Sequence, residues 1–368
     1  MKNTIGSSVC LTLFGESHGP AIGAVIDGLA PGIPVDEAEI AAWMDLRRSV
    51  SSLSTPRRES DRVEILSGVY EGKTTGTPIT LLIRNENTHS SDYATLANIP
   101  RPAHADFTAK EKYHGYADPR GGGHFSGRLT APIVAAGAIV AAALRARGIT
   151  IGTHIARCAG ICDRPFSPDP KSEIAALSDM PFAVLDSAAS ERMQAAIEAA
   201  RDAGDSVGGV LESAVCGLPA GVGEPFFDTL EGVLAHALFA IPAVKGVEFG
   251  GGFALADLRG SEANDPFRYE DGRVVTATNR AGGIQGGISN GMPILVRTAI
   301  KPTPSIFRAQ DSVDLATGEN ITMEIKGRHD PAILHRARIV ADSVIALVLA
   351  DALALRFGTD WLAGGSGK

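Results

Sequence analysis

Apolar residues fill two long segments of the chain, at about 131–147 and 332–357, on nearly every side of the helix that each would form. A helix of that composition must be enclosed by other elements, so both segments are predicted to be central helices. Segment 36–48 instead has one face marked by the spacing i, i+3, i+4, i+7, at Ile40, Trp43, Met44 and Arg47. That spacing predicts a helix with one packed face and Arg47 at its end.

Shorter patterns predict strands over 62–69 and 78–84, where residues alternate in polarity or carry β-branched side chains. A further helix is predicted over 188–203, ending at Gly204. The long polar stretch 85–125 is expected to be a loop region, and such loops are usually functional. Segment 163–185, rich in proline and polar residues, is expected to be a surface insertion, and about 362–368 a disordered tail.

The sequence contains an internal repeat. Residues 15–34 align with 204–223 through matching glycines, serines and aliphatic positions: Gly15/Gly204, Ser17/Ser206, Gly19/Gly208, Ile26/Val215, Gly28/Gly217 and Gly32/Gly221. Each copy is a glycine turn, a β-branched strand and a second turn. Each is followed by an acidic helix start that resembles a capping box, Asp36-x-x-Glu39 and Asp228-x-x-Glu231.

Two more matches follow in the same order. Gly72-x-x-x-Gly76-x-Pro78-Ile79 pairs with Gly287-x-x-x-Gly291-x-Pro293-Ile294, and Gly127-Arg128 pairs with Gly327-Arg328 ahead of the two apolar helices. We therefore expect an α+β fold with a helical core and a pseudo-twofold duplication. The repeats would span about 3–150 and 200–357 within a single domain, 1–368.

Composition narrows the class of protein. The 368 residues are 44% hydrophobic and 21% charged with a net charge of −8, which is ordinary for a globular protein and disfavours nucleic-acid or membrane binding. The most apolar stretch, Val344 to Leu355, is too short to span a bilayer. Four cysteines without metal or redox spacing, and no apolar signal core, favour a cytoplasmic protein with reduced thiols. No metal site is expected.

Two histidines lie in predicted turns beside glycine and hydroxyl groups, His18 in Gly15-Glu16-Ser17-His18-Gly19 and His104 in Arg101-Pro102-Ala103-His104. Histidine titrates near neutral pH and can move protons during turnover. In the repeat, His18 faces Val207 and Asp330 faces Thr130, so both are specialised in one copy. A nucleophilic Ser17 in a G-x-S-x-G elbow and a purely structural turn remain alternatives, although a strand, not a helix, follows this turn.

Candidate anion sites are local, because the chain as a whole is acidic. They are the arginine-rich segment 47–62 with its interleaved hydroxyls, the turn Arg120-Gly121-Gly122-Gly123-His124-Phe125-Ser126-Gly127-Arg128 before a helix, and the loop Lys301-Pro302-Thr303-Pro304-Ser305. Guanidinium groups and backbone N–H groups at a helix start bind phosphate. The arginine segment could equally be a solvated face, the loop an ordinary turn, and Asp330 an N-cap.

Together these segments resemble the chorismate synthase family from about residue 3 to 357. The resemblance is carried by Gly15–Gly19, by the 121–147 turn and helix, by Arg328-His329-Asp330-Pro331, and by 55–78, 242–248 and 301–303. It implies a layered β-α-β sandwich, a homotetramer, and a lyase that eliminates phosphate from 5-enolpyruvylshikimate 3-phosphate to give chorismate, the last common step of aromatic amino acid biosynthesis. It also implies reduced FMN without net redox chemistry.

The resemblance also implies residue roles. His18, His104 and Asp330 would be catalytic, with Ser17 and Ser126 supporting them. Arg47, Arg101, Arg128 and Arg328 would bind substrate. The flavin site would comprise His124, Phe125, Ser126, Ala243, Gly286, Lys301, Pro302, Thr303, Pro304, Ser305 and Arg328.

Three segments depart from the family pattern. Ser49–Leu53 replaces a Pro-Gly turn and often an arginine, His124-Phe125 replaces Arg or Glu and a small residue, and Ala332 replaces cysteine. We expect weaker affinity, with one substrate cation missing that Arg57 or Arg58 does not fully replace. Two alternative functions remain: a flavin oxidoreductase that consumes NAD(P)H, and a non-catalytic anion-binding or assembly protein. Because no reductase domain is recognisable in the sequence, we expect FMN to be reduced by an external source. That source would be NADPH acting indirectly or a separate flavin reductase.

Overall fold

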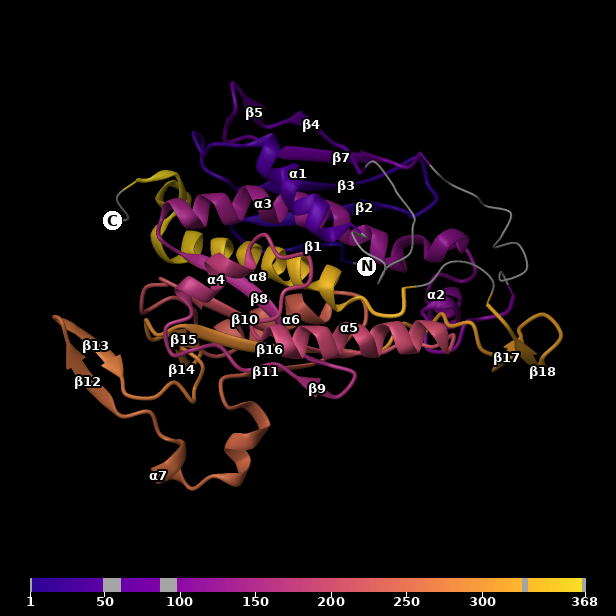
Figure 1. Cartoon of the computed structure of the whole chain (residues 1–368). Coiled ribbons are helices and arrows are strands. Elements are labelled where there is room, and N and C mark those ends of the chain that lie inside the picture. Colours follow the sequence, from indigo (N-terminus) through magenta and orange to yellow (C-terminus); the bar gives the residue numbers. More distant parts are fainter. Residues whose placement is uncertain (1, 49–60, 87–97, 326–329, 366–368) are drawn as a thin grey trace.

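Two five-stranded antiparallel sheets enclose a layer of helices in the computed structural model, which describes residues 2–48, 61–86, 98–325 and 330–365 (Figure 1). The first sheet has the order β1-β2-β3-β7-β4: Thr4–Ile5, Cys10–Gly15, Ala21–Asp27, Ile79–Arg84 and Val63–Ser67. The second has the order β11-β16-β10-β8-β9: Val244–Phe249, Ile294–Ile300, Gly209–Cys216, Thr150–Cys158 and Ile161–Cys162. This arrangement confirms the expected layered α+β fold.

Four helices form the middle layer: α1 (Glu37–Arg47), α3 (Thr130–Ala146), α6 (Leu230–Phe239) and α8 (Leu334–Phe357). Helices α3 and α8 lie against each other, while α1 packs on both and α6 packs on α8. The other α-helices within the described ranges are α2 (Asp106–Lys112), α4 (Lys171–Leu177), α5 (Ser187–Asp202) and α7 (Gly260–Ala263). Short hairpins are β5–β6 (Val69–Tyr70, Lys73–Thr74), β12–β13 (Phe267–Glu270, Arg273–Thr276), β14–β15 (Ile284–Gln285, Ile288–Ser289) and β17–β18 (Gln310–Asp314, Glu319–Met323).

The two halves repeat the same unit, because β3, α1, β7 and α3 correspond to β10, α6, β16 and α8. The strand register agrees with the sequence matches: Ile26 faces Ile79 in the first sheet, and the aligned residues Val215 and Ile294 face each other in the second. Buried hydroxyls repeat as well. Thr74 Oγ1 donates to Ala30 O at 2.6 Å, and Ser289 Oγ donates to Pro219 O at 2.6 Å. The predicted pseudo-twofold duplication is therefore present in the fold.

One matched pair of turns shows why glycine is required at both copies. Gly28 and Gly217 have φ values of 87° and 83°. A Cβ at Gly28 would lie 1.8 Å from Ser8 O, and one at Gly217 would lie 2.2 Å from Gly148 O. Only glycine tolerates both the positive φ and the close backbone, so folding accounts for this sequence match.

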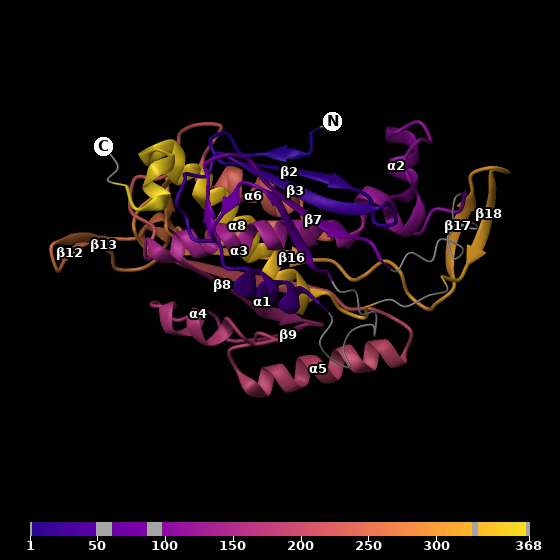
Figure 2. The ribbon, with the colours of Figure 1, turned by 90° about the horizontal axis from the view of Figure 1, so that it is seen from above.

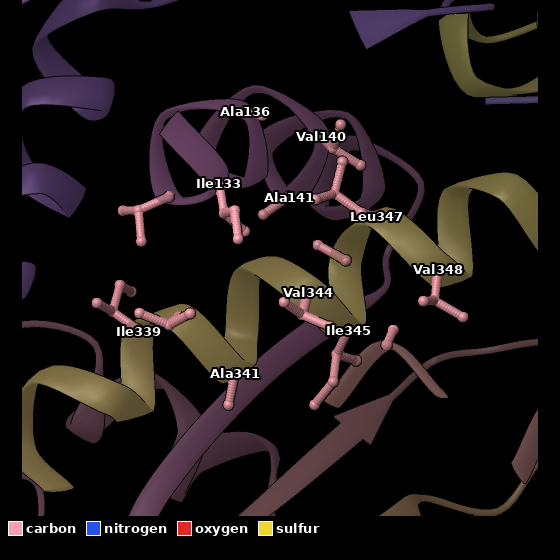
Figure 3. Close-up of a cluster of buried hydrophobic side chains, with 14 of the residues drawn as sticks. Ile133, Ala136, Val140, Ala141, Ile339, Ala341, Val344, Ile345, Leu347 and Val348 are labelled. Atoms are coloured by element: carbon pink, nitrogen blue, oxygen red, sulfur yellow. The ribbon is translucent and has the colours of Figure 1, made fainter. Parts of the chain in front are cut away.

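Helices α3 and α8 are buried along most of their length, as their apolar composition predicts (Figure 3). They approach closely at Gly137, where an added Cβ would lie 2.3 Å from Ser343 Cβ. Segment Gly127–Ala146 is long and apolar enough to cross a membrane by length and composition, but 83% of its most apolar 18-residue window is buried inside the protein. Burial of this kind is typical of the core helix of a globular protein.

The structure corrects three local expectations. Part of the 85–125 stretch forms α2 and a 3₁₀ segment, η2 (Arg120–Phe125), so it is not a continuous loop. Helix α6 is capped by Thr229, whose side chain accepts from Gly232 N, and not by Asp228. The end of the chain is ordered further than expected, because η5 (Thr359–Ala363) buries Leu362 and stacks Trp361 on Phe357.

The expected surface insertion at 163–185 lies on the outer face of the second sheet. Phe166, Leu177 and Ala183 are buried against Ala214 and Cys216 of β10. Seen from above, α4 and α5 lie along the side of the helical layer (Figure 2). Only a few positions of the segment are apolar, and those few form a small second core.

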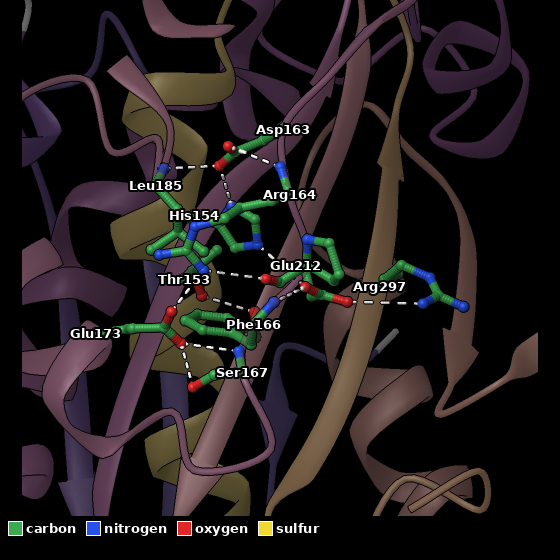
Figure 4. Close-up of polar contacts among 12 residues, drawn as sticks. Thr153, His154, Asp163, Arg164, Phe166, Ser167, Glu173, Leu185, Glu212 and Arg297 are labelled. Atoms are coloured by element: carbon green, nitrogen blue, oxygen red, sulfur yellow. Dashed lines mark hydrogen bonds and ion pairs between the residues drawn. The ribbon is translucent and has the colours of Figure 1, made fainter. Parts of the chain in front are cut away.

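A buried histidine joins this cover to the sheet (Figure 4). His154 Nδ1 lies 2.8 Å from Asp163 Oδ2 and Nε2 lies 3.0 Å from Glu212 Oε2, while Arg297 lies 3.6 Å from Glu212. Burial opposes a charged imidazole, but hydrogen bonds to the two carboxylates raise the pKa of His154 above 6.5. Despite burial, hydrogen bonds from His154 lower the pKa values of both carboxyls.

We expect this cluster to make stability depend on pH. Since the folded pKa of His154 is raised, its contribution is complete below the unfolded value near 6.5 and is lost as pH rises through the folded value. The two carboxylates stabilise the fold at pH values above their ordinary pKa. That stabilisation is lost as the pH falls through their lowered folded-state pKa values. Melting temperature measured from about pH 6.5 to 8.5 should therefore fall more steeply in the wild type than in His154→Gln. Parallel curves would contradict the assignment.

Candidate active site

A cavity of about 290 Å³ lies where equivalent elements of the two halves meet. It is lined by the segments that begin α3 and α8, by the end of α1, and by Ile241 and Pro242, which follow α6. Thr130 and Asp330 occupy equivalent repeat positions, and both line it. The remaining lining residues are Ser17, Arg47, Arg48, Asp61, Gly121, Ser126, Gly127, Arg128, Ile333, Arg336, Ala337 and Val340. The cavity is therefore a product of the duplication.

Helices α3 and α8 run in the same direction, so that both N-termini lie at the cavity end of the molecule (Figure 1). The N-terminus of a helix carries a partial positive charge and unpaired N–H groups. Two such ends at one cavity favour an anion. The nearby guanidinium groups add full charges to this potential.

Two substrate-binding candidates, Arg47 and Arg128, share one buried carboxylate. Asp61 lies 3.2 Å from Arg47 Nη1 through Oδ2 and 2.7 Å from Arg128 Nη1 through Oδ1. Arg47 also donates from Nε to Thr130 Oγ1 at 3.2 Å. Burial lowers the pKa of Arg47 to about 10, although Asp61 opposes the shift, so the guanidinium remains charged at neutral pH. The network fixes two cations beside the cavity.

The triple-glycine turn contacts both candidate histidines. Gly121, Gly122 and Gly123 all have positive φ, at 61°, 83° and 54°. A Cβ on Gly121 would lie 1.9 Å from His18 Nδ1, and one on Gly122 would lie 3.3 Å from His104 Cε1. The turn thus brings together two histidines that are 86 positions apart in the sequence. Gly121 itself lines the cavity, whereas neither histidine is among its lining residues.

His104 belongs to an ion-paired cluster with Arg101. Asp106 accepts from Arg101 Nε at 2.7 Å and Nη2 at 2.8 Å, and its Oδ1 lies 2.7 Å from His104 Nδ1. Although burial alone would raise it, hydrogen bonds from Arg101 and His104 hold the pKa of Asp106 well below its usual range. An ionised Asp106 can only accept and therefore favours a proton on His104 Nδ1, while Arg101 Nη2 lies 3.0 Å from the same nitrogen.

Asp330 belongs to the second half and is bound by Arg336 through an ion pair between Arg336 Nη1 and Asp330 Oδ2. The neighbouring His335 is buried, and burial with the charge of Arg336 lowers its pKa to about 4. His335 is therefore neutral at physiological pH. Ser126, the N-cap of η3 (Gly127–Leu129), and the buried Ser17 also line the cavity.

The 301–305 loop of the second half reaches the His104 loop. Lys301 Nζ donates to Ala103 O, and Lys301 N donates to Ala243 O at 2.9 Å. Ser206, the repeat partner of Ser17, donates to Thr303 O at 2.7 Å. In both views α2 and the β17–β18 hairpin also lie at this end (Figures 1 and 2). Segments from both halves therefore converge around the histidines.

Other candidates lie elsewhere or outside the described residues. His124 turns toward Gly15 O at 2.8 Å, and Phe125 packs edge-on against Tyr113. Gly286 lies in the β14–β15 turn, away from the cavity lining. Arg328, and the segment containing Arg57, Arg58 and Ser49–Leu53, lie outside the described residues, so their roles stay predictions. Across the described ranges, no group of three or more histidine, cysteine or acidic side chains could hold a metal ion.

Sequence reasoning missed four residues that organise the site: Asp61, Asp106, Thr130 and Arg336. The sequence could have identified Asp106, since an aspartate two positions after His104 in a turn can bind the histidine ring. The repeat alignment could have identified Thr130, because it is the repeat partner of Asp330. Asp61 and Arg336 depend on contacts between distant segments, and no local pattern identifies them.

A cavity with buried guanidinium groups and two helix N-termini, beside a glycine turn that contacts two histidines, is typical of an enzyme that binds a small anion and moves protons. The family model of chorismate synthase matches residues 9–354. The chorismate synthase of Methanocella arvoryzae is 50% identical over 351 residues, covering 95% of this chain and 93% of that one. The chorismate synthase of Dehalococcoides mccartyi is 49% identical over 360 residues, covering 97% and 98%.

Structural comparison agrees. A crystal structure of chorismate synthase superposes with a TM-score of 0.75 at 30% identity, covering 96% of this chain and 94% of the other. The chain therefore belongs to the chorismate synthase family and is a lyase that forms chorismate, acting in aromatic amino acid biosynthesis.

Proposed function

We propose that the enzyme eliminates phosphate and a ring hydrogen from 5-enolpyruvylshikimate 3-phosphate in the presence of reduced FMN, without net redox change. The observation that carries this proposal is a cavity lined by Arg47, Arg128 and the starts of α3 and α8, to which the turn that contacts His18 and His104 contributes Gly121. A substrate with two carboxylates and a phosphate needs several fixed cations, and these act most strongly where water is excluded.

The residues present fit a flavin phosphate and ring. Arg48 Nε and Thr303 Oγ1 are buried and have no hydrogen-bond partner among the described residues. Both can donate to an anion or a carbonyl oxygen. Ser126 and the 301–305 loop would hold the flavin, with Arg328 as a further candidate. When bound, reduced FMN supplies a transient electron and a base for the ring hydrogen.

The protein's own groups would bind, orient and transfer protons. Arg47 and Arg128 would hold the acidic substrate, since Asp61 fixes both guanidinium groups. His104 would give a proton from Nε2 to the leaving phosphate, because its Nδ1 is held by Asp106. His18 would hold a proton near the flavin, Asp330 would support removal of the ring hydrogen, and Ser17 and Ser126 would assist them.

Assembly, reductant and location belong to the same proposal. We expect a homotetramer, to be checked by sedimentation, and a cytoplasmic location, which suits the four free cysteines. The flavin would be reduced elsewhere, with NADPH as the indirect reductant or a separate flavin reductase as the partner.

An anaerobic assay tests the proposal. Protein, 5-enolpyruvylshikimate 3-phosphate and dithionite-reduced FMN should yield phosphate and chorismate in equal amounts, and omitting flavin should abolish both. If NADPH replaces dithionite and is consumed in proportion to product, the rival oxidoreductase is supported instead. Absence of phosphate at every flavin concentration would refute the proposed function.

A further inference from the structure

Arg336 connects the two halves of the chain at the cavity, and the proposed chemistry gives it no role. It is the third residue of α8, and its half-buried side chain lines the cavity. Its Nη1 pairs with Asp330 Oδ2, while its Nε donates to Arg47 O at 2.9 Å. One planar guanidinium group therefore binds a carboxylate of the second half and a backbone carbonyl of the first.

The carbonyl that Arg336 binds lies at the end of a helix. Helix α1 ends at Arg47, and the last carbonyls of a helix lack partners within it. A cation at this end is electrostatically favourable. From the same residue, the Arg47 side chain extends to Thr130 and Asp61. Fixing the backbone of Arg47 therefore fixes the starting point of a buried cation.

We infer that Arg336 is a positioning residue that keeps the carboxylate of Asp330 and the guanidinium of Arg47 in a constant relation across the junction of the two halves. The inference rests on the proposed function of these two groups. Lysine cannot replace Arg336, because a single ammonium lacks the planar fork that reaches two acceptors in fixed directions.

The experiment compares Arg336→Lys and Arg336→Met with Arg145→Met. Arg145 on α3 pairs with Glu39 on α1, so the control removes an arginine that also links α1 to a second helix but is absent from the cavity lining. Phosphate release with reduced FMN gives kcat and KM. Calorimetry with 5-enolpyruvylshikimate 3-phosphate in the absence of flavin gives the dissociation constant independently of turnover. Melting temperature monitors folding, and Arg336→Lys remains informative if the methionine variant fails to fold.

We expect Arg336→Met to lower kcat on the order of 100-fold and to weaken substrate binding roughly tenfold, because displacements near 1 Å have effects of this size. Arg336→Lys should recover only part of each loss, while Arg145→Met should match the wild type. In an Asp330→Asn background, Arg336→Met should lower kcat much less, because coupled residues are not additive.

Two results would overturn the inference: wild-type binding and turnover in Arg336→Lys, or full additivity with Asp330→Asn together with unchanged substrate binding. If the wild type binds substrate but releases no phosphate, the proposed function fails. In that case the calorimetric dissociation constants still test whether Arg336 positions Arg47. Weaker substrate binding in Arg336→Met than in Arg145→Met supports the inference, and equal binding contradicts it.

Discussion

Replacing His18 by alanine is expected to lower kcat by roughly 10²- to 10⁴-fold, the usual contribution of a positioned acid or base. His18 is buried against Gly121 of the triple-glycine turn, and its repeat partner is Val207. Because the duplicated turn folds with an apolar residue at that position, the fold should survive the substitution. Phosphate release under anaerobic conditions measures the loss, and circular dichroism checks the fold.

His236→Ala provides the matched control, since this histidine is exposed on α6 and absent from the cavity lining. It should retain wild-type turnover. If His18→Ala also retains full turnover with an intact fold, His18 has no part in the mechanism and the turn is structural. Gly121→Ala offers an independent check, because its Cβ would collide with the His18 ring and should reproduce much of the loss.

Replacing Asp61 by alanine is expected to lower the free energy of unfolding by about 3–5 kcal/mol, the typical cost of removing one partner from a buried ion pair. Asp61 is the shared carboxylate of Arg47 and Arg128, and all three side chains are buried. Without it, two guanidinium groups remain in a cavity that already contains two helix N-termini. Urea unfolding measured at neutral pH gives the free energy directly.

Glu64→Ala is the matched control, because Glu64 also binds an arginine, Arg84, but the guanidinium is largely exposed. Exposed pairs contribute about 0–1 kcal/mol, so this variant should unfold near the wild type. Adding substrate should restore part of the stability lost in Asp61→Ala, since a bound anion compensates the two cations. Equal losses in the two variants would show that Asp61 is not a buried counterion.

Strong local patterns predicted their elements well. The segments at 131–147 and 332–357 form α3 and α8 within a few residues, because a helix apolar on all sides has no stable place except the core. The duplication was visible because its turns need glycine at fixed positions, as at Gly28 and Gly217. The small core of segment 163–185 was not predicted, since it depends on the outer face of β10, which no local pattern displays.

The candidate site divides in the same way. His18, His104, Arg47 and Asp330 were identified by residue type, by position beside glycine turns and by the difference between repeats. Their assembly was not, because the two histidines are 86 positions apart and become neighbours of the same left-handed turn at 121–123 only in the folded chain. Asp61 and Arg336 were missed because an ion-pair partner is chosen by distance in space.

By itself, the sequence determined the helices and strands with a strong local pattern, that the chain is a duplicated unit, and which residues differ chemically between its copies. These properties depend on short-range geometry, on burial and on glycine turns, all of which are encoded locally. The tertiary structure alone decided where the copies meet, which carboxylate neutralises which guanidinium, and which ring nitrogen of His104 stays open. Electrostatic partners act over a few ångströms, so they exist only after distant segments have packed together.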